Sequence, residues 1–144
     1  MDSEALALGR AVAGQAGVSD CVRFEERDIL RLNSTLRREA DIVLAIGILC
    51  GLPHRECVRY LRIFRRYLKP GGTLVASNVS VNMLRDDVFT AWLLLNATGW
   101  QLVYKTEEEL RAIFEGAGFV WEGAYYDEPT RFHAMGVGRV PVTG

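Results

Sequence analysis

Three positions in this sequence follow short apolar runs and carry groups that could bind a small polar ligand: Asp28, Gly47 and Asn78. The Asp28 carboxylate can accept hydrogen bonds and the Asn78 amide can both donate and accept them. Gly47 lets the backbone adopt conformations that place it close to a ligand. His54 and His133 lie far apart, without a Cys, Asp or Glu pattern around them, so we expect no metal site. No nucleophile and base stand out, and the catalytic residues stay unknown.

The apolar runs predict strands that would position these groups, at Cys21 to Glu25, Asp41 to Ile46 and Thr73 to Ser77. The last two runs lack polar alternation, which is typical of strands covered on both faces in parallel sheets. The segment Lys69-Pro70-Gly71-Gly72 precedes the third run. Proline cannot continue a helix, and two glycines allow the positive φ of a tight turn. This segment therefore predicts a return from helix to strand.

Helical periodicity and capping signals place helices around these strands. The predicted helices are Ser3 to Gln15 with a cap at Asp2 or Ser3, Leu30 to Arg38, Pro53 to Leu68, Val88 to Ala97 with a cap at Asp86 or Asp87, and Thr106 to Gly116 with a capping box. Two further strands, Phe119 to Tyr126 and Phe132 to Val140, predict an antiparallel hairpin. The alternation predicts an α/β fold with a mostly parallel sheet, a C-terminal antiparallel hairpin and helices on both faces. Ligands in such sheets bind beyond the carboxyl ends of the strands.

Composition narrows the class of protein. The 144 residues carry a formal net charge of −1, which gives no general attraction to nucleic acid or to an anionic membrane. The longest apolar stretch, Val88 to Leu95, is too short for a membrane span, and the acidic start lacks a signal-peptide pattern. Cys21, Cys50 and Cys57 form no CxxC pair, so we expect reduced thiols and a cytoplasmic location.

Three segments resemble motifs of class I S-adenosylmethionine-dependent methyltransferases: Val22 to Ile29 (VRFEERDI), Ala40 to Leu49 (ADIVLAIGIL) and Leu68 to Asn78 (LKPGGTLVASN). Their order and spacing fit that family. The resemblance implies a Rossmann-like sheet, S-adenosylmethionine as cofactor and a small-molecule substrate. It also implies cofactor-binding residues, which are Asp28 at the adenine amino group, Ile29 beside it, and Ile46, Gly47 and Ile48 as a wall.

A narrower resemblance concerns the substrate. SNVSVNM and WQLVYKTEEEL are similar to segments of a bacterial subgroup associated with methyl-ester formation on 3-hydroxy fatty acids, although Val79 and Lys105 replace its Phe and Arg. The resemblance implies a lipid-like substrate with a carboxyl group. The substrate-binding candidates are Asn78, Ser80, Trp92, Trp100 and Tyr104. Two alternatives stay open, since the polar pair could cap a loop and the aromatic residues could belong to the core.

The family's first strand and the glycine-rich turn after it find no counterpart, so the chain resembles a single methyltransferase domain truncated at its N-terminus. Without the family's central strands, Cys21 to Glu25 and Asp41 to Ile46 would each expose an edge. These two strands could pair directly, a second chain could supply the missing strands, or the sequence could be a fragment. The missing turn argues against activity of this chain by itself. The alternative function is a non-catalytic interaction or apolar-ligand-binding module, forming a homodimer or binding a partner chain through its strand edges.

Overall fold

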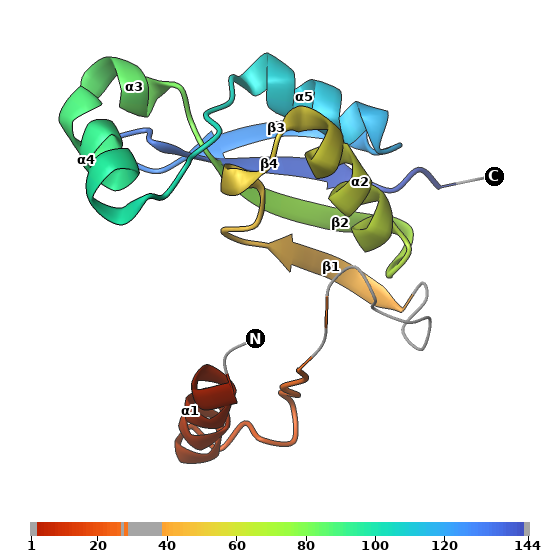
Figure 1. Ribbon diagram of the computed structural model, residues 1–144. Coiled ribbons are helices and arrows are strands. Elements are labelled where there is room, and N and C mark those ends of the chain that lie inside the picture. Colours follow the sequence, from red (N-terminus) through yellow and green to blue (C-terminus); the bar gives the residue numbers. More distant parts are fainter. Residues whose placement is uncertain (1–2, 27, 29–38, 143–144) are drawn as a thin grey trace. The chain divides into compact units, whose positions relative to one another are not determined.

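The computed structural model describes residues 3–26, 28 and 39–142. The chain divides into two compact units, Met1–Ser34 and Thr35–Gly144, and each is described by itself. The predicted helix over Leu30 to Arg38 lies outside the described residues. Figure 1 follows the chain through both units.

Among the described residues of the first unit, Ser3–Gln15 form the helix α1, as predicted. The chain then folds back along α1, because Gly17 adopts a left-handed φ of 67°. The Phe24 ring lies so close to Gly9 that a Cβ there would be 2.7 Å from a ring carbon. Arg10 also donates a hydrogen bond to the Phe24 carbonyl at 3.2 Å. The prediction of a strand over Cys21 to Glu25 is therefore wrong, since this segment packs on α1 without forming a strand.

The second unit is built on a four-stranded sheet in the order β1-β2-β4-β3, which Figure 1 shows. Its strands are β1 (Ala40–Ala45), β2 (Leu68–Val79), β3 (Val120–Tyr126) and β4 (His133–Arg139). The β1–β2 pair is parallel, whereas β4 pairs antiparallel with both β2 and β3. The α/β fold and the C-terminal hairpin are confirmed. The sheet is not mostly parallel, because β4 lies between β2 and β3 and pairs antiparallel with both.

Strand β2 begins earlier than predicted. Ala40 pairs with Leu68 and Ile42 already pairs with Thr73, so β2 bulges by several residues between these positions. Gly71 has a φ of 77°, and its N–H donates a hydrogen bond to the Val140 carbonyl at 3.0 Å. Gly71 thus provides a positive φ, as expected, but within a bulged strand, and Gly72 does not.

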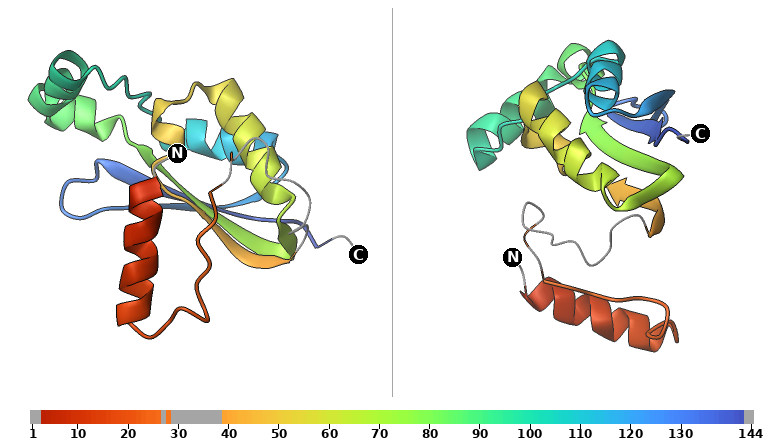
Figure 2. Two further views of the ribbon diagram at one scale, coloured as in Figure 1. Left: turned by 60° about the horizontal axis from the view of Figure 1, so that its bottom comes forward. Right: turned by 90° about the vertical axis from the view of Figure 1, so that its right-hand side faces the viewer.

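Helices α2 (His54–Arg65) and α5 (Glu107–Gly116) pack on one face of this sheet. Figure 2 shows both helices on the same side. Phe114 of α5 is fully buried over β4, where a Cβ on Gly136 or Gly138 would come within 2.8 or 2.4 Å of its ring. The absence of side chains at these two positions is what lets α5 lie close to the sheet.

The opposite face of the same sheet is open within the second unit. Ile42 and Leu44 alternate with the buried Ala45 along β1 and are 62% and 66% exposed, and Tyr125 of β3 is 67% exposed. The expectation of helices on both faces is therefore not met within residues 39–142. This open face is apolar because β1 carries branched aliphatic residues on both of its sides.

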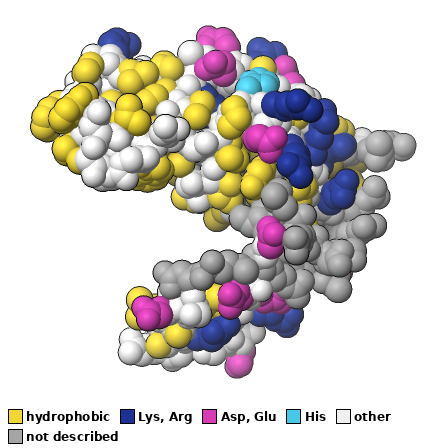
Figure 3. Space-filling model, viewed as in Figure 1, with side chains coloured by type: hydrophobic (Ala, Val, Ile, Leu, Met, Phe, Trp, Pro, Cys, Tyr) yellow, Lys and Arg dark blue, Asp and Glu magenta, His cyan; other side chains and the backbone are white. Residues whose placement is uncertain are grey.

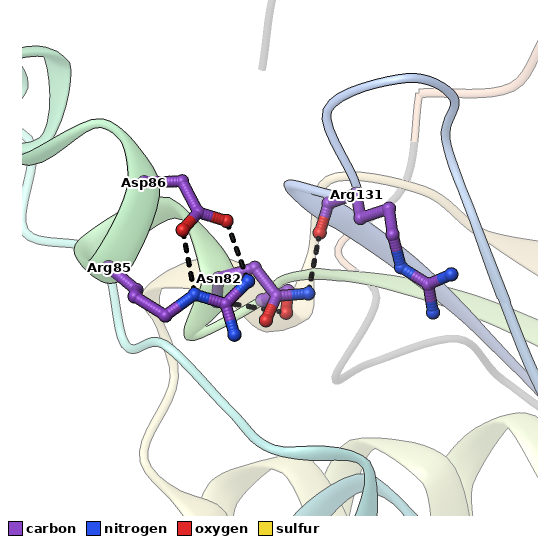
Figure 4. A network of polar contacts seen from close by, with 5 residues as sticks. Asn82, Arg85, Asp86 and Arg131 are labelled. Carbon is purple, nitrogen blue, oxygen red and sulfur yellow. Dashed lines mark hydrogen bonds and ion pairs between the residues drawn. The ribbon is translucent and has the colours of Figure 1, made fainter.

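The remaining helices are η2 (Leu49–Gly51), α3 (Asn82–Asp86) and α4 (Val88–Thr98). Two of the predicted caps are confirmed: Asp87 accepts the Thr90 N–H at 3.0 Å, and Thr106 and Glu109 form a reciprocal capping box. The cap at Asp2 or Ser3 stays a prediction, because Asp2 lies outside the described residues. The short helix α3 was not predicted. Figure 4 shows that Asn82 donates a hydrogen bond to the Arg131 carbonyl, at 3.2 Å, which ties α3 to the β3–β4 loop. The same view shows the Arg85–Asp86 ion pair on the surface of α3.

We expect Gly138→Ala to lower the free energy of unfolding by about 1–3 kcal/mol, because the new methyl group overlaps the buried Phe114 ring. The matched control is Gly116→Ala at the end of α5, where an added Cβ makes only ordinary contact with Val58 at 3.5 Å. Urea unfolding followed by circular dichroism measures both variants. Equal stability of the two would contradict the packing described for α5.

Candidate functional site

The carboxyl ends of β1 and β2 lie side by side, because these strands are parallel and Ala45 pairs with Ala76. Beyond them the chain continues as Ile46-Gly47-Ile48 on one side and as Asn78 to Ser80 on the other. This edge of the sheet is where ligands of α/β proteins bind. The structure therefore brings together two of the segments that were predicted to form a site.

Gly47 is the best-defined position of this edge. Its φ of 73° is a left-handed conformation that favours glycine, and its N–H donates a hydrogen bond to Ser77 Oγ on β2 at 2.8 Å. A Cβ built on Gly47 meets no atom within 4 Å, so the space beside its backbone is open. The preceding Ile46 is exposed. An exposed aliphatic side chain next to an accessible backbone can pack against a planar ring.

The segment after Gly47 turns into η2 and becomes buried at Leu49 and Cys50. Cys50 Sγ donates a hydrogen bond to the Gly47 carbonyl at 3.2 Å. Cys57 of α2 lies below this turn and donates to the Leu52 carbonyl at 3.4 Å. Burial raises the pKa of the Cys57 thiol, which favours a protonated thiol with its hydrogen directed at a carbonyl.

Lys105 is buried beside this segment and is only 3% exposed. Its ammonium nitrogen lies 3.0–3.1 Å from four acceptor oxygens, which share its three N–H donors. They are the carbonyls of Leu49, Leu52 and Val103 and the side-chain oxygen of Asn78. Burial lowers the pKa of Lys105, while the neighbouring Cys57, Cys50 and Glu109 act in the opposite direction. Sequence reasoning did not assign a role to Lys105. The available signal was a lysine placed between apolar residues and the capping box at Thr106.

Asn78 and Ser80 are both buried at the end of β2. Asn78 accepts from Lys105 and donates to the Val79 carbonyl at 2.6 Å, and Ser80 Oγ accepts the Asn82 N–H at 3.2 Å. These contacts agree with the alternative that the two residues stabilise the loop. Substrate binding by either residue stays a prediction, and it would require these hydrogen bonds to be exchanged.

The aromatic candidates fall into two environments. Tyr104 packs against the small cluster of Cys50, Val79 and Met83, and burial raises the pKa of its hydroxyl. Trp92 on α4 and Trp100, which follows this helix, are more than half exposed. The outer surface of α4 carries further large apolar side chains that are exposed, which are Val88, Phe89, Leu93 and Leu95. Figure 3 shows this apolar surface over α3 and α4. In the described part of the chain, no helix has the length and hydropathy needed to cross a membrane.

The two adenine-binding candidates lie apart from this edge in the chain. Asp28 is exposed and belongs to the first unit, whose position relative to the second unit is not determined. Ile29 lies outside the described residues. Their proximity to Gly47 stays a prediction.

Comparisons with known proteins identify the class of this fold. No curated protein sequence matches the chain. Among solved structures, a "possible exported protein" from Bordetella parapertussis superposes with a TM-score of 0.80 and 23% identity, over 97% of this chain and 51% of that one. The S-adenosylmethionine-dependent methyltransferase SibL gives a TM-score of 0.74 and 20% identity, over 96% of this chain and 41% of that one. The mitomycin 7-O-methyltransferase MmcR superposes with a TM-score of 0.70 and 20% identity, over 94% of this chain and 39% of that one.

At these identities the three structures establish a shared fold, and this chain spans about half of their length or less. The family itself is shown by sequence. The sequence model of a methyltransferase domain matches residues 1–127, which is most of the chain. The chain belongs to the methyltransferase-domain family.

Proposed function

We propose that this chain is the C-terminal part of a small-molecule methyltransferase and that the carboxyl ends of β1 and β2 hold one side of S-adenosylmethionine. The observation that carries the proposal is the exit of β1. Gly47 is held by Ser77 in a conformation that favours glycine, and it has open space beside it. In a chain of this family, such an accessible backbone supports a cofactor wall formed by Ile46, Gly47 and Ile48.

The residues present suit the adenosine half of the cofactor. Exposed aliphatic side chain and bare backbone at Ile46 and Gly47 could pack against the adenine ring. Asp28, an exposed carboxylate of the first unit, stays the acceptor that the family resemblance implies for the adenine amino group, with Ile29 beside it. For the methionine half, the described residues contain no strand followed by a glycine-rich turn and a helix. Binding by this chain alone would therefore rest on the adenosine half.

The substrate we propose is a small molecule with an apolar, lipid-like part. The outer surface of α4 and Trp100 offer aromatic and aliphatic area next to the end of β2. Tyr104 would close the inner side, and Asn78 and Ser80 would orient a carboxyl or hydroxyl group. A protein with the same fold, MmcR, is a mitomycin 7-O-methyltransferase. A cytoplasmic location fits the three cysteines, which are all free thiols.

The cofactor, when bound, supplies a methyl group already activated on a sulfonium. The residues of the protein then have to align the acceptor oxygen with that methyl group and exclude water. A carboxylate acceptor carries its own negative charge and needs no general base. The absence of an assigned catalytic residue is therefore compatible with the proposed reaction.

We expect the 144-residue chain to bind S-adenosylhomocysteine, the unreactive product, and Gly47→Val to weaken this binding at least about tenfold, measured by isothermal titration calorimetry. A side chain at Gly47 would strain the backbone and occupy the open space. The matched control is Gly99→Val at the end of α4, because Gly99 has a similar φ of 69° and equal room. Both variants should lose about 1–2 kcal/mol of stability. Equal affinities for the two variants, or no binding by the folded wild-type chain, would overturn the proposed cofactor site.

A second candidate function is supported by the free side of β1. Within residues 39–142, β1 pairs with β2 only, and Ile42 and Leu44 extend the apolar open face to this edge. An edge strand of this kind is a template for pairing with another chain. The alternative is thus a non-catalytic module that forms a homodimer, or binds a partner chain, through β1.

For this second candidate we expect the chain to dimerise and Leu44→Lys to dissociate the dimer, because a charge at a strand edge opposes pairing. Val120→Lys is the matched control, since Val120 is also exposed on the open face but lies in β3 at the opposite edge of the sheet. Sedimentation velocity distinguishes the two. A wild-type chain that stays monomeric at submillimolar concentration, or a control that dissociates equally, would exclude pairing through β1.

A further inference from the structure

We infer that Lys105 is a positioning residue whose ammonium group fixes the segment from Gly47 to Leu52 onto the end of β2. The inference concerns the geometry of this segment, and its value for ligand binding rests on the proposed cofactor site. Lys105 itself is buried, so it acts through the backbone that it holds and does not contact the cofactor.

The backbone of Lys105 is anchored to β2. Its N–H donates to the Val79 carbonyl at 3.1 Å, its own carbonyl accepts the Val81 N–H at 3.3 Å, and it forms an isolated parallel bridge with Ser80. The side chain can therefore transmit the position of β2 to whatever its ammonium group binds.

The ammonium group binds the far end of the Gly47 segment. It donates to the carbonyls of Leu49 and Leu52, at 3.1 and 3.0 Å, which lie at the two ends of the η2 turn. It also donates to Asn78 Oδ1 and the Val103 carbonyl, so that three chain segments converge on one charge. All four acceptors are oxygens without formal charge.

A second set of hydrogen bonds connects the segment around Lys105 to Gly47. The Val103 N–H donates to the Cys50 carbonyl at 2.6 Å, and Cys50 Sγ donates to the Gly47 carbonyl at 3.2 Å. On its other side the Gly47 N–H is held by Ser77. Gly47 thus lies between two anchors on β2, one direct through Ser77 and one through Lys105.

Burying an ammonium group is costly unless its hydrogen bonds are satisfied, and an aliphatic side chain could fill the same volume. If Lys105 is removed, the Leu49 carbonyl keeps the Leu52 N–H, whereas the Leu52 carbonyl keeps only the weak Cys57 thiol among the donors of the described residues. Buried carbonyls that lose a strong donor favour rearrangement of the turn toward water. The turn that ends at Leu52 should therefore loosen first.

The test uses Lys105→Met, which keeps an unbranched side chain one heavy atom shorter and removes the charge, and Lys105→Arg, which keeps a charge. Hydrogen–deuterium exchange should be at least about tenfold faster over residues 46–52 in Lys105→Met, while the β3–β4 hairpin stays protected as in the wild type. Lys105→Arg should exchange like the wild type. The matched control is Leu110→Ala, which removes a fully buried side chain of α5 and lowers stability while the Lys105 ammonium group is kept.

Lys105→Ala adds a rescue that a purely structural role in packing would not give. Propylammonium replaces the three carbons and the ammonium group that the substitution removes, so it should restore protection of residues 46–52, and propanol should not. If the Ala variant is unfolded, propylammonium should refold it with the same protection of residues 46–52. Unchanged exchange over residues 46–52 in folded Lys105→Met, equal loosening in Leu110→Ala, or failure of the amine rescue would overturn the inference.

Hydrogen exchange also separates this inference from the proposed cofactor site. Loosening of residues 46–52 in Lys105→Met together with no S-adenosylhomocysteine binding by the wild type would support the positioning role and reject the cofactor site. Unchanged exchange over residues 46–52 in Lys105→Met, together with S-adenosylhomocysteine binding by the wild type, would support the cofactor site and reject the positioning role.

Discussion

The buried Lys105 ammonium group is the interaction on which the arrangement of the candidate site depends. It holds four oxygens at 3.0–3.1 Å from three separate parts of the second unit. An ammonium group in a buried position is stable only when such acceptors surround it, so the lysine and the turn stabilise each other. The segment after β1, where Gly47 lies, is held in position by the contacts of Lys105 and by the hydroxyl of Ser77.

The Lys105 contacts lie at the end of the sheet, and helices cover only one face of this sheet within the second unit. On that face Phe114 packs over Gly136 and Gly138, and α2 and α5 exclude water from the sheet. The other face and the outer surface of α4 present large apolar side chains to solvent. Apolar area of this extent commonly marks sites where proteins bind ligands or other chains. This exposed apolar area is consistent with either proposed function. The methyltransferase would use the outer surface of α4 for its substrate, whereas the non-catalytic module would use β1 and the open face of the sheet.

Much of this fold could be predicted from sequence because its signals are local. The capping box at Thr106, the cap at Asp87 and the C-terminal hairpin all depend on residues within a few positions of each other, and all are confirmed. The segment Cys21 to Glu25 has strand-like composition, but a strand also needs a neighbour, and Phe24 instead packs against Gly9. The early start of β2 could not be predicted in this way, because it depends on the register between two strands. The bulge in β2 is visible only once Ala40 is paired with Leu68.

The candidate site was less accessible to sequence reasoning for a physical reason. The residue types at Gly47 and Asn78 suggested ligand contacts, but residue type does not reveal which polar groups find partners inside the protein. Asn78 turned out to be 1% exposed and bonded to Lys105. A buried lysine leaves no periodic signal, because periodicity reports where apolar residues lie and a single charge among them reads as an exposed position.

The decisive measurement is an NMR titration of the ¹⁵N-labelled chain with S-adenosylhomocysteine, following the backbone amides of the second unit. If the carboxyl ends of β1 and β2 form the cofactor wall, saturable shifts should concentrate at Ile46, Gly47 and Ile48 and leave Tyr125 on β3 unchanged. A folded chain whose Gly47 amide does not respond at millimolar ligand, or whose shifts concentrate elsewhere, would contradict a cofactor site at this edge of the sheet.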